Sequence, residues 1–113
     1  MKIPADAIIP EAKLTRYLLV LKAQDDKSKF LVQGGFSQEN PEALLAAIQF
    51  LIASAEAVED GANEFGKFFR AEGNLPGANG HNLAVVTIWL QWLSDGSFHF
   101  ITLKPKKEPR RET

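Results

Sequence analysis

The N-terminal half of the chain carries hydrophobic residues at the spacing of an α-helix. The first such set follows the i, i+3, i+4, i+7 pattern of one buried helical face and comprises Leu14, Tyr17, Leu18 and Leu21. Pro10 precedes this set and suits the first turn of a helix. The pattern therefore predicts a first helix over residues 10–19.

Two further helices are expected in the same half. The second is predicted over residues 27–33, because the Gly-Gly pair at 34–35 accepts the left-handed conformation that ends many helices. The third is predicted over residues 41–55, because Asn40 is a favourable N-cap and Pro41 suits the first helical position. Its apolar face comprises Leu44, Leu45, Ile48, Leu51, Ile52 and Ala55.

Further along the chain the hydrophobic period changes to two, which is the period of a β-strand. The predicted strands are residues 67–71, 82–93 and 97–103 and, more weakly, 57–60. Asn79-Gly80 and Asp95-Gly96 lie between them, and such dipeptides favour tight hairpin turns. The sequence therefore predicts an α+β fold, in which three short N-terminal helices pack on one face of a three- to four-stranded antiparallel meander.

Alternation along the predicted strands assigns the side chains to two faces of the sheet. The face expected to meet the helices holds Phe69, Ala71, Val86, Ile88, Leu90, Trp92, Phe98 and Phe100. The opposite face holds Phe68, Arg70, Glu72, Leu83, Val85, Thr87, Trp89, Gln91, His99 and Ile101. About half of this second face is apolar, which is unusual for a surface that meets only water.

The apolar part of the second face is predicted to bind another protein. The predicted interface residues are Phe68, Leu83, Val85, Trp89 and Ile101. Trp89 is the expected anchor, because aromatic residues are favoured at the centre of interfaces. The predicted partner is a second copy of the chain, forming a homodimer, or a small companion protein. A bulge near Thr87 would invert the two faces, and Trp92 would then take the place of Trp89.

The length and the charge distribution refine this picture. The chain has 113 residues, which suits one domain, predicted over residues 1–103. Residues 104–113 form a basic tail that is expected to be disordered. The tail holds five of the thirteen basic and two of the fourteen acidic residues, so the rest carries eight basic and twelve acidic residues. An acidic body argues against non-specific binding of nucleic acid.

The residue types exclude several kinds of site. The chain has no cysteine and only two histidines, so no metal or cofactor site is expected. Its longest apolar run falls short of the roughly 20 residues that span a bilayer. The N-terminus also lacks the continuous apolar core of a secretory signal. We therefore expect a cytoplasmic protein that does not bind membranes.

Five segments carry a family resemblance. They are IIPEAKLTRYLL (8–19), KSKFLVQGGF (27–36), FGKFFRAEGNLPGANG (65–80), VVTIW (85–89) and FITLKP (100–105). Together they resemble a bacterial domain family of unknown function that is common in cyanobacteria. Relatives of that family look like small stand-alone proteins or like C-terminal domains of toxin-like and phage-head-like proteins. The order of helices and strands is similar to that of ribonuclease toxins related to barnase and colicin nucleases, a likeness of fold alone.

The resemblance implies an alternative function, that of a metal-independent ribonuclease-type toxin acting on RNA. Such cleavage needs a base, an acid and a cation that stabilises the phosphorane. The candidates by residue type also include Lys29, Lys67 and His81, and the catalytic residues predicted from them are Arg70, Glu72, His99 and Thr102. Val86 stands where toxin-like relatives often have arginine, and this change removes a natural stabiliser of the phosphorane. We therefore prefer the protein-interaction domain and keep the ribonuclease as the alternative.

Overall fold

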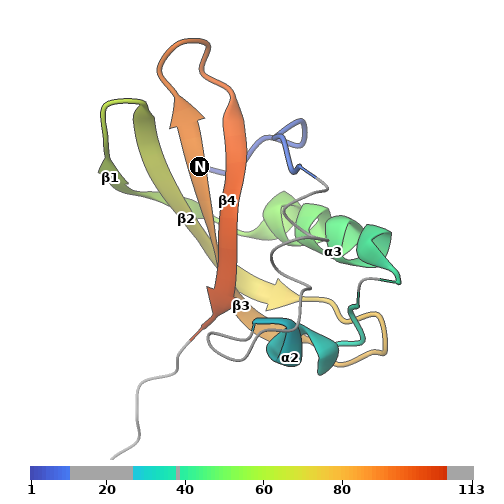
Figure 1. The fold of residues 1–113 in the computed structure, drawn as a ribbon. Coiled ribbons are helices and arrows are strands. Elements are labelled where there is room, and N and C mark those ends of the chain that lie inside the picture. Colours follow the sequence, from blue (N-terminus) through green and yellow to red (C-terminus); the bar gives the residue numbers. More distant parts are fainter. Residues whose placement is uncertain (11–26, 38, 107–113) are drawn as a thin grey trace, which may run out of the picture.

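Two helices and a four-stranded sheet make up the part of the chain that the computed structural model describes, residues 1–10, 27–37 and 39–106. The elements are α2 (Lys27–Val32), α3 (Pro41–Ser54), β1 (Ala57–Ala62), β2 (Gly66–Leu75), β3 (Leu83–Trp92) and β4 (Phe98–Pro105). The strands form one antiparallel sheet in the order β1-β2-β3-β4, so the predicted α+β class and meander are confirmed (Figure 1). Residues 11–19 of the predicted helix over residues 10–19 lie outside the described residues.

Helix α3 supplies the helical side of the core. Its buried residues are Leu44, Ala47, Ile48, Leu51 and Ile52, which recur at helical spacing. Pro41 lies in the first turn as predicted. Asn40 precedes the helix, but its side chain makes no capping hydrogen bond. Instead its Oδ1 accepts the N–H of Ser37 at 2.8 Å, and its Nδ2 donates to the carbonyl of Gly35 at 3.1 Å. Asn40 therefore holds the preceding loop.

The predicted faces of β3 are inverted in the structure. Phe69 of β2 lies opposite Trp89, and Leu75 lies opposite Leu83. Leu83, Trp89 and the alternate residues of β3 between them therefore share the face of Phe69. That face is buried against α3, and Trp89 is 0% exposed. Trp92, predicted to share a core with the third helix, lies on the other face and is 42% exposed. Alternation could not decide this, because both sets of alternate residues in β3 are apolar.

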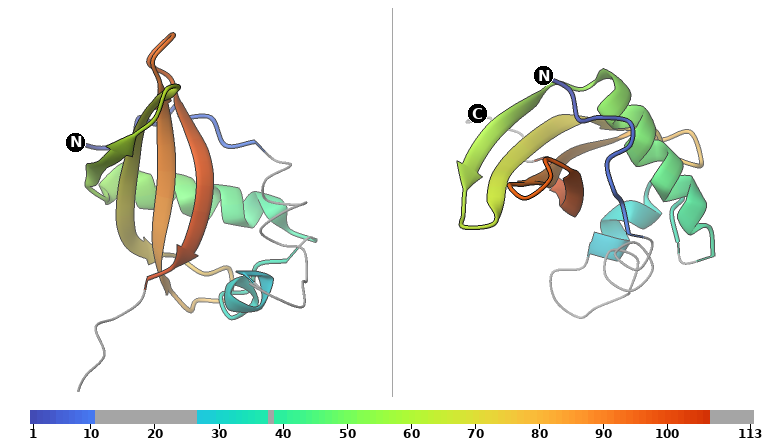
Figure 2. Two further views of the ribbon diagram at one scale, coloured as in Figure 1. Left: turned by 60° about the vertical axis from the view of Figure 1, so that its left-hand side comes forward. Right: turned by 90° about the horizontal axis from the view of Figure 1, so that it is seen from above.

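The core lies between the sheet and the helices. In the left-hand view of Figure 2 the sheet stands in front of α3, and Leu31 of α2 joins the same core. Trp89 packs edge-on against Phe100, with ring centroids 5.3 Å apart. The indole N–H of Trp89 donates to Oγ1 of buried Thr87 at 2.8 Å, and that hydroxyl donates to the carbonyl of Ala71 at 2.9 Å. Thr87 is therefore a hydrogen-bonded core residue.

Strand β4 contains a bulge and extends beyond its predicted end. Phe100 pairs with Trp89 and Thr102 with Ile88, so Ile101 is an extra residue in the strand. The bulge shifts the alternation, and buried Leu103 therefore faces the core. The strand reaches Pro105, two residues past the predicted domain end at 103, and the next residue donates its N–H to the carbonyl of Ala84 at 2.9 Å. Residues 107–113 of the predicted tail lie outside the described residues.

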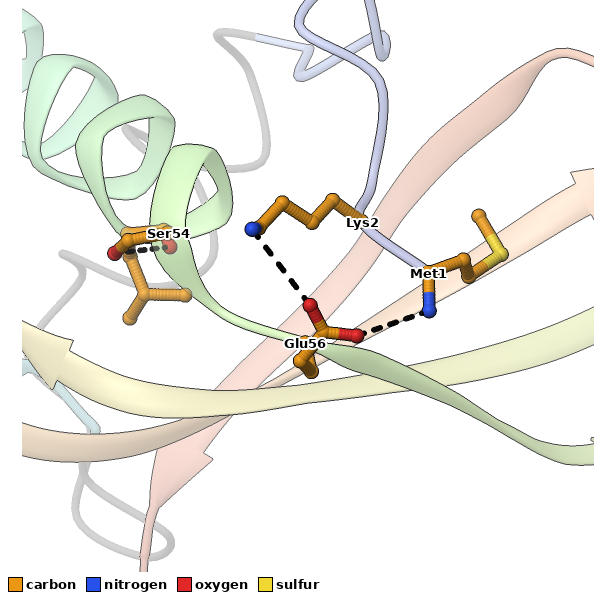
Figure 3. Close-up of polar contacts among 5 residues, drawn as sticks. Met1, Lys2, Ser54 and Glu56 are labelled. Atoms are coloured by element: carbon orange, nitrogen blue, oxygen red, sulfur yellow. Dashed lines mark hydrogen bonds and ion pairs between the residues drawn. The ribbon is translucent and has the colours of Figure 1, made fainter.

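The first residues of the chain are tied to the junction between α3 and β1. The N-terminal ammonium of Met1 lies 3.1 Å from Oε1 of Glu56, and Nζ of Lys2 lies 3.6 Å from Oε2 of the same carboxylate (Figure 3). The hydrogen bond from the ammonium is the main cause that lowers the pKa of Glu56. Further on, Ile8 donates its N–H to the carbonyl of Phe98 and accepts the N–H of Phe100, both at 2.8 Å. The N-terminal segment thus contacts both ends of the meander.

The described helices are short. The longest, α3, has 14 residues, and none in the described ranges is long and apolar enough to cross a membrane.

Candidate functional site

The sheet face opposite α3, called the open face below, is the candidate site. Strand pairing arranges it in four rows: Gly66–Trp92, Phe68–Leu90–His99, Arg70–Ile88–Thr102 and Glu72–Val86–Lys104. Both described helices lie on the other side of the sheet (Figure 2). The open face therefore carries an apolar centre between polar flanks without cover from α2 or α3.

An apolar cleft of about 700 Å³ opens at the hairpin-tip end of the open face. Its lining comprises Glu64, Phe65, Leu90, Trp92, Leu93 and Ser94. Phe65 is 64% exposed and Leu93 is 67% exposed, so both leave large apolar side chains in water. The two hairpins that carry them are joined by a hydrogen bond of 2.9 Å from the N–H of Leu93 to the carbonyl of Phe65.

Local hydrogen bonds hold Phe65 at the rim of the apolar cleft. Oδ1 of Asn63 accepts the N–H of Phe65 at 2.9 Å and the N–H of Gly66 at 3.0 Å. The next position allows no side chain, because a Cβ on Gly66 would collide with the carbonyl of Gln91. Glycine at 66 therefore lets β2 approach β3 closely beside Trp92.

Trp92 also belongs to a stacked pair at the edge of the apolar cleft. Its ring is stacked on His99 with centroids 4.2 Å apart. Nε2 of His99 lies 2.8 Å from the hydroxyl of Ser97, and that hydroxyl lies 2.7 Å from Oδ1 of Asp95. Hydrogen bonds from the Ser97 hydroxyl and N–H lower the pKa of Asp95, so this end of the open face keeps a negative charge.

A charged groove of about 360 Å³ lies at the other end of the open face. Its lining comprises Asp60, Arg70, Glu72, Val86, Ile88, Lys104 and Pro105. Nε of Arg70 lies 3.1 Å from Oε2 of Glu72, although this buried N–H has no well-aligned acceptor. Nζ of Lys106 lies 3.4 Å from the other oxygen of Glu72. The carboxylate of Glu72 therefore forms ion pairs with both Arg70 and Lys106, and the charged groove keeps an excess of positive charge.

The structure places all four predicted catalytic residues on the open face, but it divides them between its two ends. Arg70 and Glu72 form an ion pair in the charged groove, whereas His99 lies at the apolar cleft. Strands β2 and β4 are two strand spacings apart, and His99 is two residues further along than Arg70, so their Cα atoms are roughly 12 Å apart. Thr102 lies in the row of Arg70, across β3. His99 is thus one row away from Arg70 and across β3 from it, and the Arg70 side chain lies against Glu72 instead.

The predicted interface set also divides between the two faces. Leu83, Val85 and Trp89 are buried in the core, so a partner on the open face cannot reach them. Phe68 lies on the open face, half-buried in the row of Leu90, and Ile101 is the half-buried bulge residue.

Sequence reasoning missed the residues that form the apolar cleft. One signal was present: the large apolar residues Phe65 and Leu93 directly flank the two hairpin turns, where polar residues are usual. In the described part of the chain, no group of three or more His, Asp or Glu side chains is placed to hold a metal ion.

Residues 4–107 match the model of a family described as a domain of unknown function, DUF6883. This finding agrees with the resemblance to a domain family of unknown function, while its expected distribution among cyanobacteria and toxin-like proteins stays a prediction. No curated protein and no solved structure matches the chain.

Proposed function

Because the chain belongs to the DUF6883 family, whose description names no activity, we propose a function from the open face: it is a protein-interaction domain that binds another polypeptide there. The occupant is a second copy of the chain or a companion protein. The observation that carries this proposal is the exposure of Phe65, Trp92 and Leu93 around a single apolar cleft. Monomeric proteins rarely leave such side chains clustered in water.

The chemistry of the open face suits a polypeptide. Trp92 is held by its stack on His99, so it would lose little side-chain entropy on binding. Aromatic residues in this setting are frequent hot spots of protein interfaces. The charged groove beside the apolar rows would orient a partner through complementary charges rather than supply most of the affinity. The open face thus offers an anchor and an orienting flank.

Replacing Trp92 tests the proposal directly. Trp92→Ala should weaken binding by about 2 kcal/mol or more, or about 30-fold in Kd, if Trp92 is a hot spot. Phe50→Ala is the matched control, because Phe50 is a 66% exposed aromatic residue on α3. Both variants are compared with the wild type by sedimentation velocity and by affinity capture from cells of the source organism. The proposal fails if Trp92→Ala retains every association that the Phe50→Ala control retains.

A metal-independent ribonuclease remains the second candidate, because Arg70, Glu72, His99 and Thr102 share one face. We rank it second because Arg70 is already paired with Glu72 and lies across β3 from His99. Incubation of the pure protein with total RNA and a chelator decides between the two. Cleavage that is lost in both Arg70→Ala and His99→Ala would reverse this ranking.

A further inference from the structure

The two ends of β4 carry opposite charges on the open face. Asp95 lies in the turn before the strand and stays ionised through its bonds to Ser97. Lys104 lies at the far end, opposite Val86, and Nζ of Lys106 reaches Glu72 on the same side of the sheet. The tip end carries Glu64 and Asp95. The open face is therefore negative at the tip end, whereas the far end sets three cations (Arg70, Lys104 and Lys106) against two carboxylates (Asp60 and Glu72) and keeps a single excess positive charge.

The rows between these ends are apolar. β3 contributes Val86, Ile88, Leu90 and Trp92 in sequence along the open face. Val86 and Leu90 are nearly buried already, whereas Trp92 is 42% exposed. The face therefore has an apolar stripe that runs between two oppositely charged ends.

From this pattern we propose that the occupant of the open face is a second copy of this chain, packed face to face with its strands antiparallel. The proposal rests on the proposed function and names its partner. The two copies are related by a two-fold axis that lies between the two sheets and runs perpendicular to the strands. This axis places β3 over β3 and β4 over β4, with the strands of the two copies running in opposite directions. Lys104 of each copy then meets Asp95 of the other, and Leu90 of each copy meets Ile88 of the other. The same surface supplies both the apolar stripe and its complementary charges.

The size of the open face sets the strength of this dimer. The six steps from Val86 to Trp92 and three strand spacings give a footprint of roughly 20 by 14 Å. Such a footprint, about 280 Å² per copy, is smaller than the roughly 800 Å² per partner of a standard interface, so we expect a weak dimer with Kd on the order of hundreds of micromolar. The charge contacts are solvent-accessible, and added salt should therefore weaken the dimer.

Charge reversal and mixing test the arrangement. Lys104→Glu places two negative charges together at both symmetric contacts, and Asp95→Lys places two positive charges together there. Each variant alone should therefore dimerise at least about tenfold more weakly than wild type. An equimolar mixture of the two restores opposite charges at both contacts and should recover affinity to within about threefold of wild type. Ser94→Lys repeats the test without disturbing the hydrogen bonds that Ser97 donates to Asp95. Sedimentation equilibrium of each variant, of the mixtures and of wild type gives the constants.

The outcomes separate this proposal from the one on which it rests. Recovery in the mixture supports the antiparallel dimer. A mixture that associates no better than its components overturns the antiparallel arrangement, whereas the proposed function stands if Trp92→Ala still weakens the wild-type dimer. A wild type that stays monomeric at about 500 µM overturns the second copy as occupant. In that case, loss of a companion by Trp92→Ala would still support the proposed function.

Discussion

The hydrogen bonds of Thr87 provide the sharpest test of how β3 is oriented. Thr87 is fully buried; its Oγ1 accepts the indole N–H of Trp89 at 2.8 Å and donates to the carbonyl of Ala71 at 2.9 Å. Thr87→Val keeps the shape of the side chain but removes the hydroxyl. The indole N–H of Trp89 would then be buried without an acceptor.

The expected cost of Thr87→Val follows from two opposing terms. A buried donor left unsatisfied costs about 1–3 kcal/mol. The new methyl group returns up to about 0.8 kcal/mol through apolar burial. We therefore expect a net loss of about 0.2–2 kcal/mol in the free energy of unfolding, which urea titration followed by far-ultraviolet circular dichroism measures.

A double-mutant cycle with Trp89→Phe isolates the hydrogen bond. Trp89→Phe removes the indole donor, so Thr87→Val should cost less in that background, with a coupling of about 0.5 kcal/mol or more. Coupling near zero, together with a loss below about 0.5 kcal/mol for Thr87→Val alone, would refute the reasoning. Trp89 would then not donate to Thr87 in the core.

Three further predictions concern stability and ionisation. Ile48→Ala should cost about 2–5 kcal/mol in urea unfolding, because Ile48 is fully buried, and a loss below about 0.5 kcal/mol would contradict its place in the core. Gly66→Ala should lower the free energy of unfolding by about 1–3 kcal/mol more than Gly73→Ala does. A Cβ at 66 meets the facing backbone, whereas a Cβ at 73 meets only side chains at 3.5 Å or more, so equal losses would contradict this. Acetylating the N-terminus should raise the pKa of Glu56 toward its ordinary value, observed by carbon NMR of the carboxyl group. Because the folded-state pKa is lowered, the contribution of this pair to stability is present above the ordinary pKa and is lost as pH falls through the lowered one; an unchanged pKa after acetylation would contradict the contact.

The elements were predictable where the signal is local. α3 begins at Pro41 and ends within one residue of its predicted end, because its start signal and its apolar period lie within the helix itself. Gly80 and Gly96 adopt positive φ values of 92° and 75°, as the predicted turns require. The prediction at residues 79–80 was nevertheless too tight, since the connection between β2 and β3 covers residues 76–82.

The orientation of β3 was not predictable, because it depends on pairing between distant residues. The length of the β2–β3 connection sets which residue of β3 meets Phe69, and a shift of one residue would exchange the two faces. Both faces of β3 are apolar, so the sequence offers no preference. The same exchange moved the predicted interface anchor from Trp89 to Trp92 and placed Leu83 and Val85 in the core. The shared face of Arg70, Glu72 and His99 was predictable, because β2 and β4 alternate clearly there.

The central claim is that Trp92 lies on the surface with which this protein binds a second copy of itself, while Trp89 is enclosed by its own fold. The chain has two tryptophans, so fluorotryptophan labelling gives two fluorine NMR signals, which a Trp92→Phe variant assigns. The measurement follows both signals from about 10 to 500 µM protein. The account predicts that the Trp92 signal shifts with concentration and loses its solvent sensitivity, while the Trp89 signal stays constant. Two constant signals, or a shift of the Trp89 signal alone, would contradict it.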